Sequence, residues 1–253
     1  MQGYRLSRDW LIANWIVLKV IESAALLVRS VPYGEADVVA TFFTEVEGKV
    51  AAMVRGARRS TKRFGGTLEP MHELVVRFED RGRELCVLKE ARIGRAREGI
   101  VSSLASMEMA GRALRWVRHV CPAKTPEPAA WLELRALLDS LDSGVADECA
   151  RLVVFGVRLL SDVGYGLEFE RCVRCAKPCP EGRSAFVDAS GGGIVCVSCG
   201  GAERTMPAEL RVTAVRLQRR EEGVAMTVAA ASELLSIVED AMAAHTGYGP
   251  LSI

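Results

Sequence analysis

Three observations predict an α+β multidomain fold: an N-terminal five-stranded OB-type β-barrel, followed by an α-helical domain with an inserted four-cysteine module. Short strand-like segments fill residues 23–93, helical periodicity begins after Ile100, and two Cys-x-x-Cys pairs interrupt the helical region. A length of 253 residues suits one large domain or two to three small ones.

The predicted strands lie at residues 23–30, 38–44, 49–55, 74–78 and 85–89. Glu47-Gly48 and the stretch 80–82 are hairpin-like breaks between them. Five short strands in about seventy residues favour a small closed barrel, and the OB type is the commonest solution of that size. Strand count alone leaves other small barrels open.

Apolar periodicity predicts helices at residues 106–120, 129–141, 145–163, 207–219 and 230–245. Cys121-Pro122 ends the first helix, because proline cannot continue the hydrogen-bond ladder, and Gly164 caps the third. The cysteine segment is therefore an insertion between helices. We predict an N-terminal extension at 1–20, the barrel at 21–98, the helical domain at 99–170 and 204–253, and the module at 171–203.

The strongest chemical signal is the set Cys172, Cys175, Cys196 and Cys199, two Cys-x-x-Cys pairs separated by twenty residues. This spacing is typical of four-cysteine Zn²⁺ sites, in which no coordination position stays open for substrate. We therefore expect a structural zinc ion. Two disulfides or buried thiols are the alternative, and Cys179, between two prolines, competes for a ligand position. Metal spacing among only eight cysteines favours a reducing cytoplasm.

The N-terminal segment loosely imitates a signal peptide, with Arg5 and Arg8 before an apolar run at 10–18. Asp9, Asn14 and Lys19 interrupt the run, which is too short to span a bilayer. We expect an N-terminal extension rather than a targeting signal, and no membrane association.

The best functional candidate outside the cysteines is the basic segment 55–63, which is expected to be a mobile loop between two barrel strands. Its cations are Arg55, Arg58, Arg59, Lys62 and Arg63, with no acidic residue among them. Such loops bind phosphodiester backbones by releasing counterions, and Phe64 could add base stacking. With a formal net charge of only +1, affinity for nucleic acid depends on this local patch. The alternative is a solvated loop that binds nothing.

Catalytic patterns are scarce in the sequence. None of the three histidines belongs to a metal or triad motif, and the acidic residues form no convincing Mg²⁺ cluster. The glycines at 191–193 lack the lysine and serine or threonine of a phosphate-binding loop. We expect a binding function without enzymatic activity.

Several stretches together resemble the bacterial recombination mediators of the RecO family. They are VRSVPYGEAD at 28–37, EGKV at 47–50, the basic segment with FGG at 64–66, LEP at 68–70, the cysteine pairs, and GYGPLS at 247–252. The resemblance covers residues 22–253 and implies an OB-fold, a helical domain and a zinc module.

The resemblance also implies function. Family members bind single- and double-stranded DNA, anneal complementary strands, and work with RecR to load RecA, in the cytoplasm and near the nucleoid. Some contact the single-stranded-DNA-binding protein. Matching positions make the five cations of the basic segment DNA-contact candidates and the four cysteines zinc ligands. A zinc-stabilised protein–protein adaptor with secondary DNA contact is the alternative, and a metal-dependent nuclease is a third, less favoured possibility.

Overall fold

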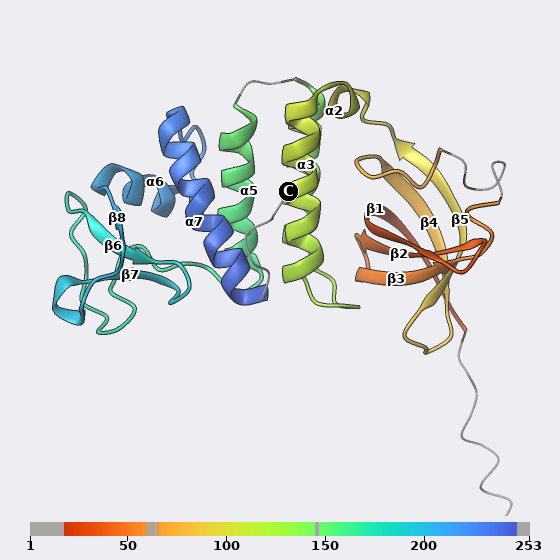
Figure 1. Cartoon of the computed structure of the whole chain (residues 1–253), viewed down its shortest axis with the longest axis horizontal. Helices are drawn as coiled ribbons and strands as arrows, with labels where there is room; N and C mark the ends of the chain where they lie inside the picture. Colours follow the sequence, from red (N-terminus) through yellow and green to blue (C-terminus); the bar gives the residue numbers. More distant parts are fainter. Residues whose placement is uncertain (1–17, 60–63, 65, 145–146, 247–253) are drawn as a thin grey trace, which may run out of the picture.

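A computed structural model describes residues 18–59, 64, 66–144 and 147–246. A β-barrel and a small β-sheet lie at opposite ends of the molecule, with a helical body between them (Figure 1). The elements follow in the order β1 (Lys19–Tyr33), β2 (Asp37–Thr44), β3 (Gly48–Val54), β4 (Glu73–Asp80), β5 (Cys86–Arg95), α2 (Glu98–Ser102), α3 (Leu104–Val120), α4 (Pro128–Asp142), α5 (Glu148–Asp162), β6 (Ala185–Asp188), β7 (Gly193–Val195), the 3₁₀ turn η2 (Val197–Cys199), β8 (Arg204–Met206), α6 (Ala208–Gln218) and α7 (Val228–Thr246).

The first five strands form a closed barrel in the order β1-β2-β3-β5-β4, which confirms the predicted architecture. Only β3 and β5 pair in parallel. Along β3, Val50, Ala52 and Val54 point into the barrel, because side chains alternate between the two faces of a strand. Phe42 and Phe78 meet edge to face in the core, with ring centroids 5.3 Å apart.

Strand β1 is longer than the sequence indicates and closes the barrel. Its first half pairs with β4 and its second half with β2, with a register shift between Leu27 and Arg29. Lys19 and Val20, expected in an extension, belong to this strand, whereas residues 1–17 lie outside the described part of the chain.

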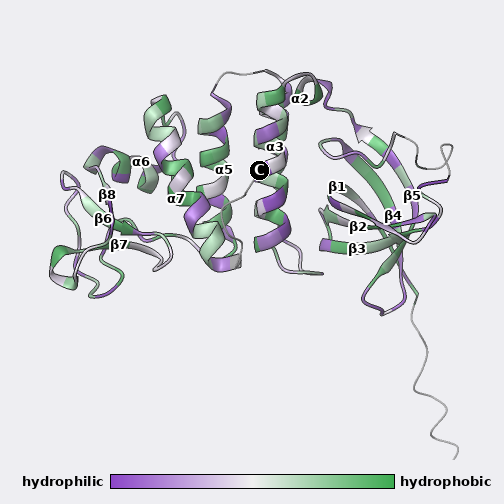
Figure 2. Cartoon of the chain, in the orientation of Figure 1, coloured by the Kyte–Doolittle hydropathy of each residue, from purple (hydrophilic) through white to green (hydrophobic). Residues whose placement is uncertain are grey.

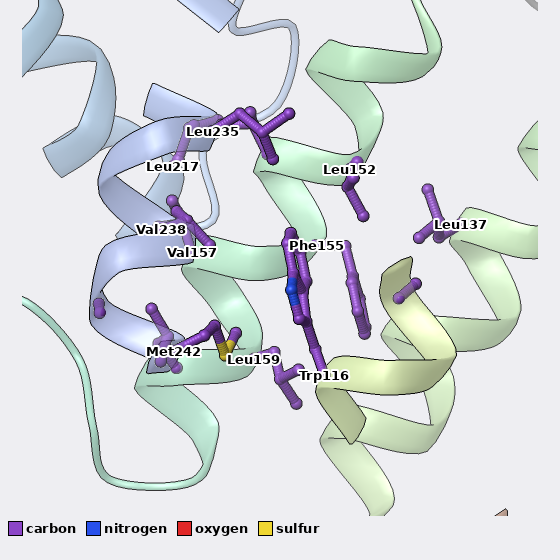
Figure 3. Close-up of a cluster of buried hydrophobic side chains, with 14 of the residues drawn as sticks. Trp116, Leu137, Leu152, Phe155, Val157, Leu159, Leu217, Leu235, Val238 and Met242 are labelled. Atoms are coloured by element: carbon purple, nitrogen blue, oxygen red, sulfur yellow. The ribbon is translucent and has the colours of Figure 1, made fainter. Parts of the chain in front are cut away.

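The helical domain is built around α5, which packs against α3, α4, α6 and α7. Trp116 of α3 stacks on Phe155 of α5 at 6.3 Å between ring centroids, and Val238 and Met242 of α7 complete the cluster (Figure 3). Apolar residues dominate α5, whereas α3 carries polar residues among its apolar ones (Figure 2). No helix in the described part of the chain is long and apolar enough to cross a membrane.

Apolar side chains of the barrel pack against the helical core. Leu26 and Phe43 project from the outside of the barrel into the helical core, where Phe43 packs on Trp131 of α4 at 5.8 Å between centroids. The short helix α2, absent from the sequence prediction, connects the two parts. At the far end of the helical body, β6, β7 and β8 form a three-stranded sheet in the order β7-β6-β8.

Candidate metal centre and candidate nucleic-acid interface

The four predicted cysteines come together in one cluster, in which all four sulfur atoms lie within 4.8 Å of one another. The Sγ atoms of Cys175 and Cys196 are 3.7 Å apart. A tetrahedral ion with thiolates at about 2.3 Å would hold its sulfurs about 3.8 Å apart, so the donor set fits a metal of this kind. None of the eight cysteines forms a disulfide, which is the alternative the sequence left open.

Two tight backbone turns position these sulfurs. In the first, the amide of Ala176 donates to the carbonyl of Cys172 at 2.8 Å; in the second, the amide of Gly201 donates to the carbonyl of Cys196 at 3.2 Å. A hydrogen bond connects the first turn to β7, which leads into the second turn: the amide of Val173 donates to the carbonyl of Ile194 at 2.9 Å. Gly193 is required at this place, because a Cβ atom there would lie 2.2 Å from the carbonyl oxygen of Glu168.

The electrostatics of the cluster favour a bound cation. The amide of Cys196, 3.4 Å from the Cys172 sulfur, and then the amides of Arg174 and Cys175 lower the pKa of Cys172 to about 6. The sulfurs of Cys196 and Cys175 raise the pKa of Cys199 to about 12, because they stabilise its protonated form. Four thiolates at this separation repel one another, so complete deprotonation requires a positive ion between them.

Cys179, the competing ligand, lies outside the cluster. Its sulfur points instead toward the carbonyl oxygens of Pro180 and Arg183, at 3.9 Å from each.

The module is fastened to the helical domain by Arg211 of α6, which sequence reasoning missed. Its side chain is 2% exposed, and its guanidinium donates to the carbonyl oxygens of Phe169 at 2.8 Å, Glu181 at 3.0 Å, Arg183 at 3.3 Å and also Pro180. Only a guanidinium offers enough donors in a fixed fork for such a set of carbonyls. The sequence alone gives no signal that separates this arginine from its exposed neighbours.

The basic segment leaves the barrel at the end of β3, and its described cations, Arg55, Arg58 and Arg59, are exposed. Lys62 and Arg63 lie outside the described residues. The base of the segment is fixed to the turn between β1 and β2: the amide of Gly56 donates to the Asp37 carboxylate at 2.8 Å, and the amide of Arg58 donates to the carbonyl of Ala36 at 2.9 Å.

The contacts of the arginine side chains leave them accessible. Arg58 donates to the Gly34 carbonyl at 3.1 Å, and Arg59 pairs with Glu35 at 2.8 Å. Both members of that pair are largely solvent-exposed, so the pair contributes little stability and is readily exchanged for another anion. The turn therefore gives Arg58 no carboxylate partner among the described residues and holds Arg59 only in an exposed ion pair.

The expectation that Phe64 stacks on nucleotide bases is wrong. Its ring is 4% exposed and packs in the barrel core, so it is not placed to stack on a nucleotide base. The apolar interior of the barrel takes up the ring, an outcome that proximity to basic residues in sequence could not reveal.

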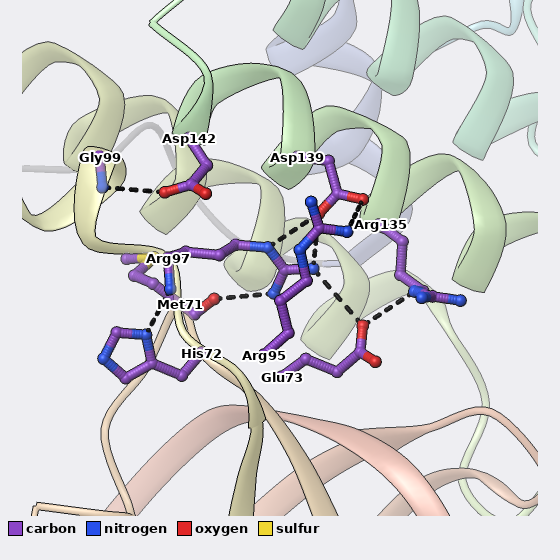
Figure 4. Close-up of polar contacts among 9 residues, drawn as sticks. All are labelled: Met71, His72, Glu73, Arg95, Arg97, Gly99, Arg135, Asp139 and Asp142. Atoms are coloured by element: carbon purple, nitrogen blue, oxygen red, sulfur yellow. Dashed lines mark hydrogen bonds and ion pairs between the residues drawn. The ribbon is translucent and has the colours of Figure 1, made fainter.

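Two arginines at and just beyond the end of β5 contact the helical domain. Arg97 is completely buried between barrel and helices, where its guanidinium contacts Asp139 of α4 at 2.9 Å and the carbonyl of Met71 at 3.0 Å (Figure 4). Arg95 pairs with the same carboxylate at 2.7 Å. Both residues join the two domains; Arg97 is buried, whereas the Arg95 side chain is half exposed and its charge is paired with Asp139.

Comparison with known proteins agrees with this architecture. The family model described as Recombination protein O N terminal matches residues 18–97, and Recombination protein O C terminal matches residues 104–252. A DNA repair protein RecO of Anaeromyxobacter sp. (strain K) is 35% identical over 218 residues, covering 85% of this chain and 84% of the relative. The RecO of Geobacter sulfurreducens is 32% identical over 180 residues, covering 71% and 73%.

An OB-type barrel, a helical domain and these matches define a protein of DNA repair and recombination. The chain belongs to the RecO family.

Proposed function

We propose that this protein is a non-enzymatic recombination mediator. It binds single- and double-stranded DNA, anneals complementary strands, and acts with RecR to help load RecA on single strands coated by the single-stranded-DNA-binding protein. The observation that carries the proposal is the exposed row of Arg55, Arg58 and Arg59 on an OB-type barrel, whose first connection and second and third strands are a common oligonucleotide-binding face. Family membership supports the repair context.

The four-cysteine cluster supports a structural role for zinc. Its ligand set is closed, and it lies at the end of the molecule opposite the barrel (Figure 1). In the described part of the chain it is the one group of three or more metal-ligating side chains. We therefore propose that Zn²⁺ folds the module, while the barrel contacts DNA.

DNA binding is tested with a labelled oligothymidine in fluorescence anisotropy titrations at several salt concentrations. On single strands, each phosphate contact contributes about −0.7 to the slope of log affinity against log salt. In the variant Arg58→Gln with Arg59→Gln, we expect a slope less negative by about 1.4 and an affinity loss on the order of tenfold at low salt. Because phosphate contacts carry no base information, the loss should be the same for all sequences.

The matched control is Arg171→Gln with Arg219→Gln, which removes two positive charges from exposed positions, one directly before Cys172 and one directly after α6. It should leave the slope unchanged. Wild-type binding without salt dependence would contradict the proposal. Capture of RecR or of the single-stranded-DNA-binding protein, in the absence of any DNA affinity, would favour a zinc-stabilised protein adaptor instead.

A further inference from the structure

A cleft of about 230 Å³ lies between β1 of the barrel and α3 of the helical domain. Its apolar lining includes Leu27, Val28 and Leu114, and two arginines, Arg29 of β1 and Arg115 of α3, also line it. In the described part of the chain, neither arginine forms an ion pair with a carboxylate. The cleft therefore combines apolar surface with two uncompensated positive charges.

More basic groups surround these two arginines. Arg115, Arg118 and His119 share one face of α3, because residues three and four apart are neighbours on a helix. Lys49 of β3 donates to the carbonyl of Arg118 at 2.6 Å, and Arg118 contacts the His119 ring at 2.7 Å. Burial, and then the charges of Arg118, Lys49, Arg115 and Arg29, lower the pKa of His119.

Stabilisation of the helix end explains only part of this cluster. Lys49, Arg118 and His119 lie at the carboxyl end of α3, where positive charge offsets the helix dipole. Arg115 lies more than a turn before that end and Arg29 belongs to the barrel, so neither is explained in this way. Two cations from different domains that converge on one cleft indicate an anionic ligand.

The cleft is continuous with the basic segment along the outside of β1. Arg29, Val31 and Tyr33 alternate along the strand and are all exposed, Val31 by 39% and Tyr33 by 59%. Tyr33 directly precedes Gly34, whose carbonyl accepts a hydrogen bond from Arg58. At about 3.3 Å per residue, Arg29 and Tyr33 are separated by roughly 13 Å. Val31 and Tyr33 thus form an apolar and aromatic ridge on β1, between the cleft at one end and the basic segment at the other.

We propose that the β1–α3 cleft is a second phosphate-binding site, in which Arg29 and Arg115 hold a single DNA strand that runs along β1 from the basic segment. Bases lie against Val31 and Tyr33, and phosphates are neutralised at both ends of the ridge. The inference rests on the proposed DNA-binding function and assigns it a track across both domains. Continuity with the basic segment favours a nucleic acid strand over an acidic peptide.

The test compares two oligothymidines, one of about two nucleotides, which at about 3.4 Å per nucleotide is too short to reach both cationic sites, and one of about twenty nucleotides, which reaches both. For Arg29→Gln with Arg115→Gln, we expect the salt slope on the long strand to become less negative by about 1.4 and the affinity to fall on the order of tenfold at low salt. The short strand, which the basic segment alone can hold, should lose much less.

The control pair Arg171→Gln with Arg219→Gln should change neither strand's affinity. An unchanged slope on the long strand for the Arg29 and Arg115 variant, with normal wild-type binding, would overturn the second site while leaving the proposed function intact. Loss of binding to a labelled acidic peptide with no change in DNA affinity would identify the cleft as a peptide site and also overturn it. If the wild-type protein binds neither strand, the proposed function itself fails.

Discussion

Arginine has three different roles in this chain, and burial distinguishes them. Arg58 is exposed, and among the described residues its guanidinium donates to a turn carbonyl and forms no ion pair, so its charge stays available to a partner. Arg211 is buried and its donors are used by backbone carbonyls of the cysteine module. Arg97 is buried and paired with a carboxylate. A buried guanidinium must be fully bonded, so the last two positions are structural.

Spacing in the sequence was sufficient to predict the cysteine cluster, because two Cys-x-x-Cys turns constrain their sulfurs locally. It was not sufficient for Phe64, whose position in the core depends on how the barrel closes around it. The β1–α3 cleft was also missed. Arg115, Arg118 and His119 show helical spacing in sequence, but Arg29 joins them only through the packing of two domains.

Two neighbouring cysteines provide a test of the metal centre at the level of single residues. We expect about one Zn²⁺ per chain, and replacement of Cys175 by Ser should reduce metal content severely, because it removes a ligand of the cluster. Cys179→Ser, only four residues away and outside the cluster, should retain the metal and the fold. Elemental analysis together with hydrogen exchange in the 168–206 region measures both effects. Equal metal content in the two variants would contradict the assignment of ligands.

At the scale of the secondary-structure elements, the boundaries of several helices follow from the sequence, whereas the lengths of two strands do not. The predicted helices at 106–120, 129–141 and 207–219 agree closely with α3, α4 and α6, because a proline marks one end of each. The lengths of β1 and β5 were underestimated, since polar residues on their outer faces resemble loop residues in sequence. Helix α5 is central because it touches every other long helix of the domain.

Two helix glycines predict opposite effects of the same substitution. At Gly156 of α5, an added Cβ atom would lie 2.6 Å from Val238 and 2.8 Å from the Trp116 ring, so Gly156→Ala should destabilise by about 1–3 kcal/mol despite better helix propensity. At Gly111 of α3, an added Cβ meets nothing within 4 Å, so Gly111→Ala should stabilise by up to about 1 kcal/mol. Urea unfolding measures the free energy of unfolding of both variants. A change of the same sign in both would refute the packing argument.

At the scale of the whole molecule, the barrel and the helical domain are joined by a polar network as well as by the Phe43–Trp131 contact. Besides Asp139, Arg97 reaches Glu73 of β4 at 3.5 Å, while its amide donates to the His72 ring at 3.1 Å (Figure 4). The network therefore connects the end of the barrel directly to α4. A DNA track that crosses from β1 to α3 requires such a joint, because the two cationic sites must keep a fixed separation.

Removal of the Asp139 carboxylate should weaken the connection between the barrel and the helical domain. In Asp139→Ala the buried guanidinium of Arg97 loses its main counter-charge, and breaking a buried ion pair in this way costs about 3–5 kcal/mol. We expect a lower midpoint in urea unfolding and faster hydrogen exchange in both β4 and α4, since the network spans the two domains. Glu222→Ala, at an exposed position with no hydrogen bond or ion pair to another described residue, is the control and should match the wild type. If faster exchange were confined to α4, Asp139 would stabilise only its own helix, and the joint would depend on the apolar contact instead.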